Sequence, residues 1–120
     1  MNYPYRPFYP LKRLKGKLNK VHKLKLNSYA RYLYLNPIDG VLISYENTHK
    51  FPHSPNYVIK LDEIKDLKIL MEHKWYFKKG QYYLRITSEA KVVIFYKNNL
   101  DLINFWFKEI QASKEFYEWL

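Results

Sequence analysis

Cysteine is absent from this 120-residue sequence, which excludes disulfides, thiolate nucleophiles and cysteine-bound metals. Long hydrophobic runs are missing as well. VVIFY at 92–96 is among the longest, far below the roughly 20 residues of a membrane-spanning helix. The first ten residues, MNYPYRPFYP, contain no apolar stretch like that of a signal peptide. We therefore expect a cytoplasmic protein, and we leave open its attachment to a membrane surface or to a large intracellular assembly.

Acidic residues are absent before Asp39, which makes the distribution of charge uneven. The chain has a net charge of +10, and the segment before Asp39 holds nine basic residues, so the remainder is nearly neutral. A segment of this kind suggests an anionic partner for one region of the protein. A second explanation stays open, because lysines on strand edges also keep sheets from aggregating. The nine residues are Arg6, Lys12, Arg13, Lys15, Lys17, Lys20, Lys23, Lys25 and Arg31.

Residue patterns typical of catalysis or metal binding are also missing. The sequence contains no Ser-His-Asp pattern, no glycine-rich phosphate loop and no isolated pair of acids in apolar surroundings. His49 and His53 are four residues apart, but Pro52 and Pro55 place them in a loop and not on one helix face. We therefore expect no enzyme, no cofactor and no metal site.

The composition that remains predicts one folded domain. Hydrophobic residues make up 48% of the chain and aromatic residues 19%, which favours a β-rich core. Residues 1–11 differ from the rest, since the first ten contain three prolines and four aromatic residues. Prolines at this spacing favour extended backbone. We expect an arm over 1–11 and a single domain over 12–120.

Alternation of apolar and polar residues predicts seven strands, over 14–19, 29–35, 41–45, 57–61, 66–77, 82–87 and 91–96. Residues 20–28 are less regular and are expected to form a long hairpin connection. After Asn99 the period changes to about 3.6, which predicts one helix to the C-terminus. Asn98 or Asn99 is expected to cap it. The apolar stripe of this helix predicts core positions for Ile103, Trp106 and Ile110.

Several short motifs occur in a characteristic order: GKLNK at 16–20, RYLYL at 31–35, VLISY at 41–45, VIKL at 58–61, YLRIT at 83–87 and DLINFWFKEI at 101–110. Their order and spacing resemble the pleckstrin homology (PH) domain, with Trp106 at the position of the signature tryptophan in that family's helix. The resemblance extends from about residue 12 to residue 119. It implies a mainly β fold with one α-helix, in which a bent antiparallel barrel of seven strands is capped by the C-terminal helix.

The resemblance also implies a site between the first two strands, where lipid-binding members of the family hold inositol phosphates. Their pattern is a lysine at the end of the first strand, followed after a loop by a basic residue, any residue and arginine. Lys20 and Arg31 occupy the outer positions here, and Tyr29 stands where the family has the middle basic residue. We therefore predict binding to an anionic phospholipid or phosphoinositide headgroup through Lys17, Lys20, Lys23, Lys25 and Arg31.

The sequence has features that suit two other kinds of partner. The aromatic arm and the apolar C-terminus favour a protein partner, in which case the PH scaffold would be an assembly subunit without tight lipid binding. The residues expected to touch such a partner are Tyr5, Phe8, Tyr9 and Trp119. Tyrosines interleaved with lysines also occur where single-stranded nucleic acid binds. The resemblance argues against a nucleic acid, and the charge distribution slightly favours lipid over protein.

Overall fold

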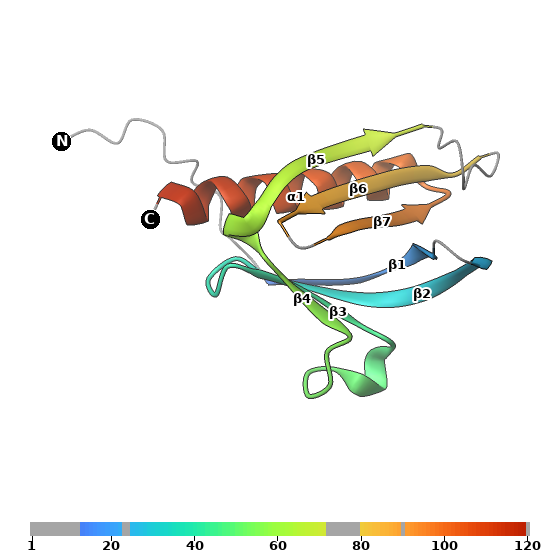
Figure 1. Ribbon diagram of the computed structural model, residues 1–120, viewed down its shortest axis with the longest axis horizontal. Coiled ribbons are helices and arrows are strands. Elements are labelled where there is room, and N and C mark those ends of the chain that lie inside the picture. Colours follow the sequence, from blue (N-terminus) through green and yellow to red (C-terminus); the bar gives the residue numbers. More distant parts are fainter. Residues whose placement is uncertain (1–12, 23–24, 72–79, 90, 120) are drawn as a thin grey trace.

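The computed structural model describes residues 13–22, 25–71, 80–89 and 91–119, with the backbone alone described for 22, 25–29 and 119. Seven strands are followed by one long helix (Figure 1). The strands are β1 Leu14–His22, β2 Lys25–Asn36, β3 Val41–Tyr45, β4 Tyr57–Lys60, β5 Ile64–Leu70, β6 Tyr82–Ser88 and β7 Val92–Lys97. Two short 3-10 helices, η1 Thr48–Lys50 and η2 Leu61–Glu63, flank β4, and the C-terminal helix is α1 Leu100–Trp119. This order confirms the predicted fold class.

All seven strands belong to one antiparallel sheet with the order β4-β3-β2-β1-β7-β6-β5. The sheet is bent between β1 and β7, which pair only at Asn19 with Tyr96 and at Lys20 with Phe95. It therefore divides into two layers, β1–β4 below and β5–β7 above in Figure 1. The helix α1 runs beside β5–β7, and it contacts β5, η2, β6 and β7.

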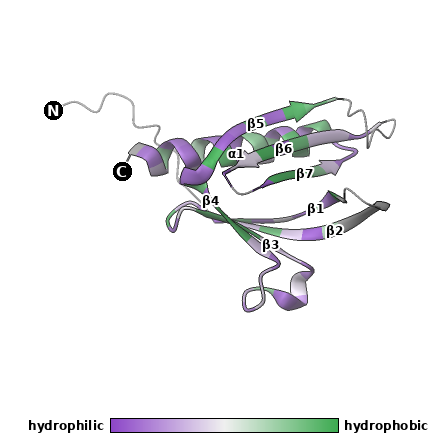
Figure 2. Cartoon of the chain, in the orientation of Figure 1, coloured by the Kyte–Doolittle hydropathy of each residue, from purple (hydrophilic) through white to green (hydrophobic). Residues whose placement is uncertain are grey.

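Alternation along the strands separates an inner from an outer face. Leu18 of β1 and Leu33 of β2 are fully buried on the inner face, whereas Lys15 and Lys17 are exposed on the outer face. Hydrophobic residues recur along β6 and α1, while the segment that carries η1 is mainly hydrophilic (Figure 2). Both sheet layers and α1 contribute to one core. Its members include Leu18, Leu33, Leu35, Leu42, Ile59, Leu84, Ile86, Phe95, Ile103, Trp106 and Ile110.

The prediction of a long connection over 20–28 is wrong. The ladder between β1 and β2 continues through Lys20 with Tyr29 to His22 with Lys25. A register shift lies between Lys20 and His22. Such an irregularity breaks the period of two in the sequence while the backbones remain paired. The basic segment is therefore a long two-stranded ribbon.

The fifth strand also differs from its predicted range of 66–77. It begins at Ile64, directly after η2, and a register shift between Ile64 and Asp66 disturbs the alternation at its start. It ends at Leu70, and residues 72–77 of the predicted range lie outside the described residues.

The helix begins where the sequence indicates. Asn99 precedes its first residue, and its side-chain Oδ1 accepts a hydrogen bond of 3.1 Å from the backbone N–H of Leu102. This bond satisfies one of the N–H groups that have no partner within the helix. It confirms the predicted cap, and it sets the register that turns Ile103, Trp106 and Ile110 toward the core.

Candidate anion-binding site

Two of the predicted site residues lie on the inner face, just beyond the buried part of their strands. Lys20 follows the buried Leu18 on β1 by two positions, and Arg31 precedes the buried Leu33 on β2 by two positions. Because strand side chains alternate, both cations continue the inward-facing rows. Both are half-buried, and Arg31 also donates from Nη1 to the carbonyl of its neighbour Ala30 at 3.2 Å. These two residues are therefore brought together on one face.

A tyrosine ring forms the centre of this site. The Nζ atom of Lys20 lies 4.6 Å from the ring centroid of Tyr57, the first residue of β4. The Nζ atom of Lys91 lies 4.4 Å from the same centroid. Both distances are typical of cation–π contacts, in which an ammonium group sits over the negative face of an aromatic ring. Three segments far apart in the sequence therefore converge here.

The turn between β6 and β7 holds Lys91 in this position. The carbonyl of Lys91 accepts two hydrogen bonds from Ser88, one from the backbone N–H at 2.9 Å and one from Oγ at 3.0 Å. These bonds fix the backbone of Lys91, while its side chain is exposed. An exposed lysine on a fixed backbone can reach a ligand without a change of fold.

The positive charges of the site affect one another. The pKa of Lys20 is lowered from 10.5, first by partial burial and then by the positive charges of Arg31 and Lys91. The charge of Lys20 is therefore repelled by both of the other side chains. An anion placed among them would relieve this repulsion and would receive charge-assisted hydrogen bonds.

Beneath the cations lie two buried hydroxyl groups. Tyr57 pairs with Ser44 across β3 and β4, and burial raises the pKa of the Tyr57 phenol, while the Ser44 hydroxyl and the charge of Arg31 lower it by less. The oxygen atoms of both hydroxyls are buried, and neither makes a hydrogen bond of good geometry among the described residues. The two hydroxyl groups are therefore neighbours that are not aligned for a hydrogen bond.

The other predicted lipid-binding residues are not part of this cluster. Lys17 pairs with Tyr32 and is exposed on the outer face of the sheet, opposite to Lys20. Lys23 lies outside the described residues, and for Lys25 only the backbone at the start of β2 is described. Tyr29, the departure from the family pattern, pairs directly with Lys20.

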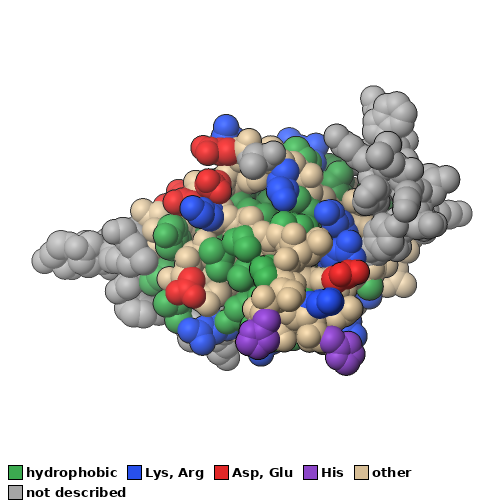
Figure 3. Space-filling model, turned by 60° about the horizontal axis from the view of Figure 1, so that its bottom comes forward, with side chains coloured by type: hydrophobic (Ala, Val, Ile, Leu, Met, Phe, Trp, Pro, Cys, Tyr) green, Lys and Arg blue, Asp and Glu red, His purple; other side chains and the backbone are tan. Residues whose placement is uncertain are grey.

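The outer face carries an aromatic cluster of its own, formed by Phe51 and three tyrosines. Phe51 follows η1, and its ring packs edge-on against the tyrosines at centroid distances of 5.1 to 5.6 Å. The Nζ atom of Lys15 lies 4.7 Å from the centroid of Phe51. Hydrophobic side chains gather on the face seen in Figure 3, with charged side chains of both signs around them. The phenylalanine of the β3–β4 loop therefore packs on the outer face against Tyr32, Tyr34 and Tyr45.

Sequence reasoning missed two members of the anion-binding site, Tyr57 and Lys91. Lys91 was expected to be the first residue of the seventh strand, but it lies in the turn before it. Pairing of β1 with β7 and of β3 with β4 brings both residues to Lys20. The sequence contains no local signal for these long-range pairings.

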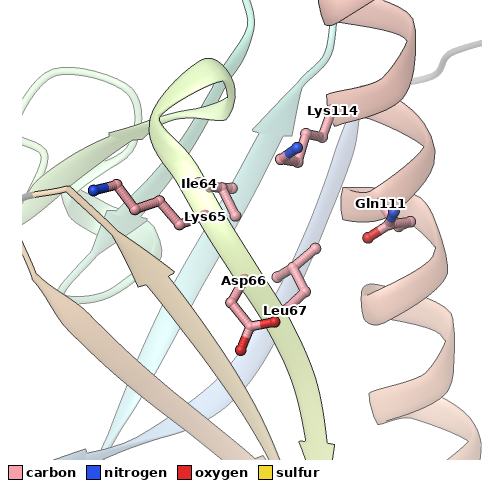
Figure 4. A pocket seen from close by; sticks show the side chains of 6 residues that line it. All are labelled: Ile64, Lys65, Asp66, Leu67, Gln111 and Lys114. Carbon is pink, nitrogen blue, oxygen red and sulfur yellow. The ribbon is translucent and has the colours of Figure 1, made fainter.

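A hollow of about 200 Å³ lies between β5 and α1. Gln111 and Lys114 extend from α1 toward β5, and Leu67 extends from β5 toward the helix (Figure 4). Charges of both signs line the hollow, and Asp66 lies 3.5 Å from the guanidinium of Arg85. Two lysines and one aspartate line the hollow, and Lys114 is already paired with Glu118, so this hollow is a weaker anion site than the cluster around Tyr57.

The residues predicted to touch a protein partner cannot be placed. Tyr5, Phe8 and Tyr9 lie outside the described residues, and Trp119 ends α1 with only its backbone described. Within the part of the chain that is described, no three histidine, aspartate or glutamate side chains are grouped to hold a metal ion. None of the described helices is both long and apolar enough to cross a membrane.

Comparison with known proteins adds structural relatives. No sequence-family model and no curated protein matches the chain. Three human PH domains, all solved in solution, are similar in structure. That of oxysterol binding protein-related protein 11 is 14% identical with a TM-score of 0.67, over 91% of this chain and 86% of that one. The N-terminal PH domain of ARAP2 is 14% identical with a TM-score of 0.68, over 92% and 86% of the two chains.

The third of these structures gives the same result. The PH domain of TBC1 domain family member 2 is 15% identical with a TM-score of 0.65, over 89% of this chain and 84% of that one. Sequence identities at this level are evidence of a shared fold only. The structural similarity extends over most of each chain. The seven-stranded antiparallel sheet and the C-terminal helix therefore form a pleckstrin homology fold.

Proposed function

We propose that this protein is a non-catalytic binding module that attaches to anionic membranes containing phosphoinositides, through Lys20, Arg31 and Lys91. The observation that carries the proposal is the convergence of two ammonium groups on the ring of Tyr57, with a guanidinium beside them. The positive charges of these side chains repel one another, and an anion bound among them would offset that repulsion. A phosphate group supplies two negative charges and several acceptor oxygens.

Further lysines add to this attachment without forming the site. Near an anionic leaflet each basic residue contributes about 1 kcal/mol, and the effect falls off within a Debye length. Lys25 begins β2, the strand that also carries Arg31, and Lys23 lies two positions before it in the sequence. Lys17 faces the opposite side of the sheet, so we assign it long-range attraction only.

The test is co-sedimentation of the whole chain with vesicles of phosphatidylcholine alone, with phosphatidylserine added, and with each of several phosphoinositides added. Each mixture is measured at physiological and at high salt. We expect preferential binding to phosphoinositide vesicles that persists at moderate salt, because several donors would hold one headgroup. Binding to every anionic vesicle that disappears with salt would leave only a diffuse basic surface. Absence of binding to all vesicles would refute the proposal.

A protein ligand is the second candidate, and one observation favours it. The strand β5 is an edge of the sheet, and the hollow between it and α1 lies beside that edge. An extended peptide can add to an exposed edge by main-chain hydrogen bonds while its side chains enter a neighbouring hollow. In co-precipitation, Leu67→Glu and Gln111→Glu would abolish capture of such a partner while vesicle binding stays unchanged. Unchanged capture by both variants would refute this candidate.

A further inference from the structure

We propose that Tyr57 is a positioning residue of the anion-binding site. Its ring holds the ammonium groups of Lys20 and Lys91 together, and it releases them to a phosphate group when one binds. The release step rests on the proposed function. The holding step does not, since it concerns the protein without a ligand.

The first argument is the geometry of three segments. Lys20 comes from β1, Lys91 from the β6–β7 turn and Tyr57 from β4. The two nitrogen atoms lie 4.6 and 4.4 Å from one ring centroid. Two long, flexible side chains of like charge would separate in water unless each gained from a common contact. The negative face of the ring supplies that contact.

The second argument is that the ring is the fixed member of the group. Tyr57 is anchored in β4 by pairing with Ser44, and its hydroxyl oxygen is buried. The side chain of Lys91, by contrast, is exposed. A buried ring beneath long lysine side chains can serve as a template, because the lysines can change rotamer to meet a ligand while the ring stays in the strand.

The third argument concerns what a ligand would change. Phosphate oxygens carry full negative charge, so they attract an ammonium group more strongly than a ring face does. A phosphate monoester that enters the site would therefore draw both lysines away from Tyr57. The chemistry is the same for a lipid headgroup and for a free inositol phosphate, and both are included as probes below.

The experiment uses NMR spectra of the full chain labelled with ¹³C, which resolve the ε-CH₂ groups of lysine. Protons over an aromatic ring are shielded, so we expect upfield ε-CH₂ signals for Lys20 and Lys91 in the unliganded protein. The signal that is lost in Lys20→Gln is assigned to Lys20, and the signal that is lost in Lys91→Gln is assigned to Lys91. Both signals should move downfield when soluble inositol 1,4,5-trisphosphate is added. Unshifted signals in the unliganded wild-type protein overturn the holding step, whatever any variant does.

Two variants of the tyrosine give the matched comparison. Tyr57→Phe keeps the ring, so it should keep the upfield signals and bind within about twofold of wild type. Tyr57→Leu removes the ring, so it should lose both signals and bind about five- to tenfold more weakly. Binding is measured to the soluble phosphate and to phosphatidylcholine vesicles with a phosphoinositide. Wild-type affinity of folded Tyr57→Leu for both probes overturns the proposal.

The failure of the proposed function is distinguishable from the failure of this inference. If the wild-type protein binds the soluble phosphate but no vesicle, the ligand is a free phosphate and the membrane function fails. If it binds neither probe while its upfield signals are present, the release step and the proposed function both fail. If it binds both probes but the signals stay upfield in the complex, the release step alone is overturned.

Discussion

A Cβ atom placed on Gly16 would lie 2.8 Å from Cζ2 of Trp106. Cβ atoms do not approach other heavy atoms so closely, so the first strand and the helix meet at a point where only glycine leaves enough room. Trp106 itself is 1% exposed. The glycine of the first strand and the tryptophan of the helix therefore form one contact that joins the lower sheet layer to α1.

We predict that Gly16→Ala lowers the free energy of unfolding by roughly 1–3 kcal/mol, as expected when a methyl group is forced into a packed core. Chemical denaturation checks this. The control is Lys17→Ala on the neighbouring exposed position, which should change stability by less than about 0.5 kcal/mol. Equal effects of the two substitutions would contradict the close contact with Trp106.

We predict that Trp106→Ala lowers the free energy of unfolding by roughly 3–5 kcal/mol, in the range of buried aromatic truncations. Its neighbour Phe105 is 45% exposed, so Phe105→Ala should cost much less. Thermal and urea unfolding of both variants make the comparison. A Trp106→Ala protein as stable as Phe105→Ala would mean that the helix turns a different face to the sheet.

Much of this contact could be predicted from the sequence, because it depends on local periods. The period of two over 14–19 correctly placed Lys15 and Lys17 on the exposed face, and the period near 3.6 correctly located the helix. Of the two predicted cap residues, Asn98 and Asn99, the structure shows Asn99. The length of the basic ribbon was misjudged, as was the start of the fifth strand. The register shift between Lys20 and His22 removes the alternation on which such a prediction depends.

The anion-binding site was only partly predictable. Lys20 and Arg31 were found through the family pattern, and pairing of neighbouring strands brings them together. Tyr57 and Lys91 join them through the bend of the sheet and through a turn between later strands. Neither feature has a local sequence signal, because each depends on which strands pair at long range.

We predict that binding of an anion is coupled to uptake of a proton at alkaline pH. The pKa of Lys20 is lowered from 10.5 by partial burial and by the charges of Arg31 and Lys91. A bound phosphate favours the ammonium form and raises this pKa. As the pH rises through the lowered pKa, a growing fraction of Lys20 must gain a proton for binding, so affinity should fall.

Calorimetry with a soluble inositol phosphate checks this, in two buffers of different ionisation enthalpy at a pH just below 10.5. The binding enthalpies measured in the two buffers should differ, with the sign that corresponds to proton uptake by the protein. Lys20→Arg is the control, because a guanidinium keeps its charge at this pH and the buffer dependence should shrink. Proton release on binding would have the wrong sign for this account.

The most direct test of the central claim compares two double variants that lose the same charge from opposite faces of the sheet. Lys20→Gln with Lys91→Gln removes both ammonium groups over Tyr57, and Lys15→Gln with Lys17→Gln removes two from the outer face. Both are measured by co-sedimentation with phosphoinositide vesicles at physiological salt, after equal thermal midpoints have been established. We predict that the inner pair weakens binding at least about tenfold and the outer pair about threefold or less. Equal losses from the two pairs would contradict a headgroup site around Tyr57 and would assign binding to net charge alone.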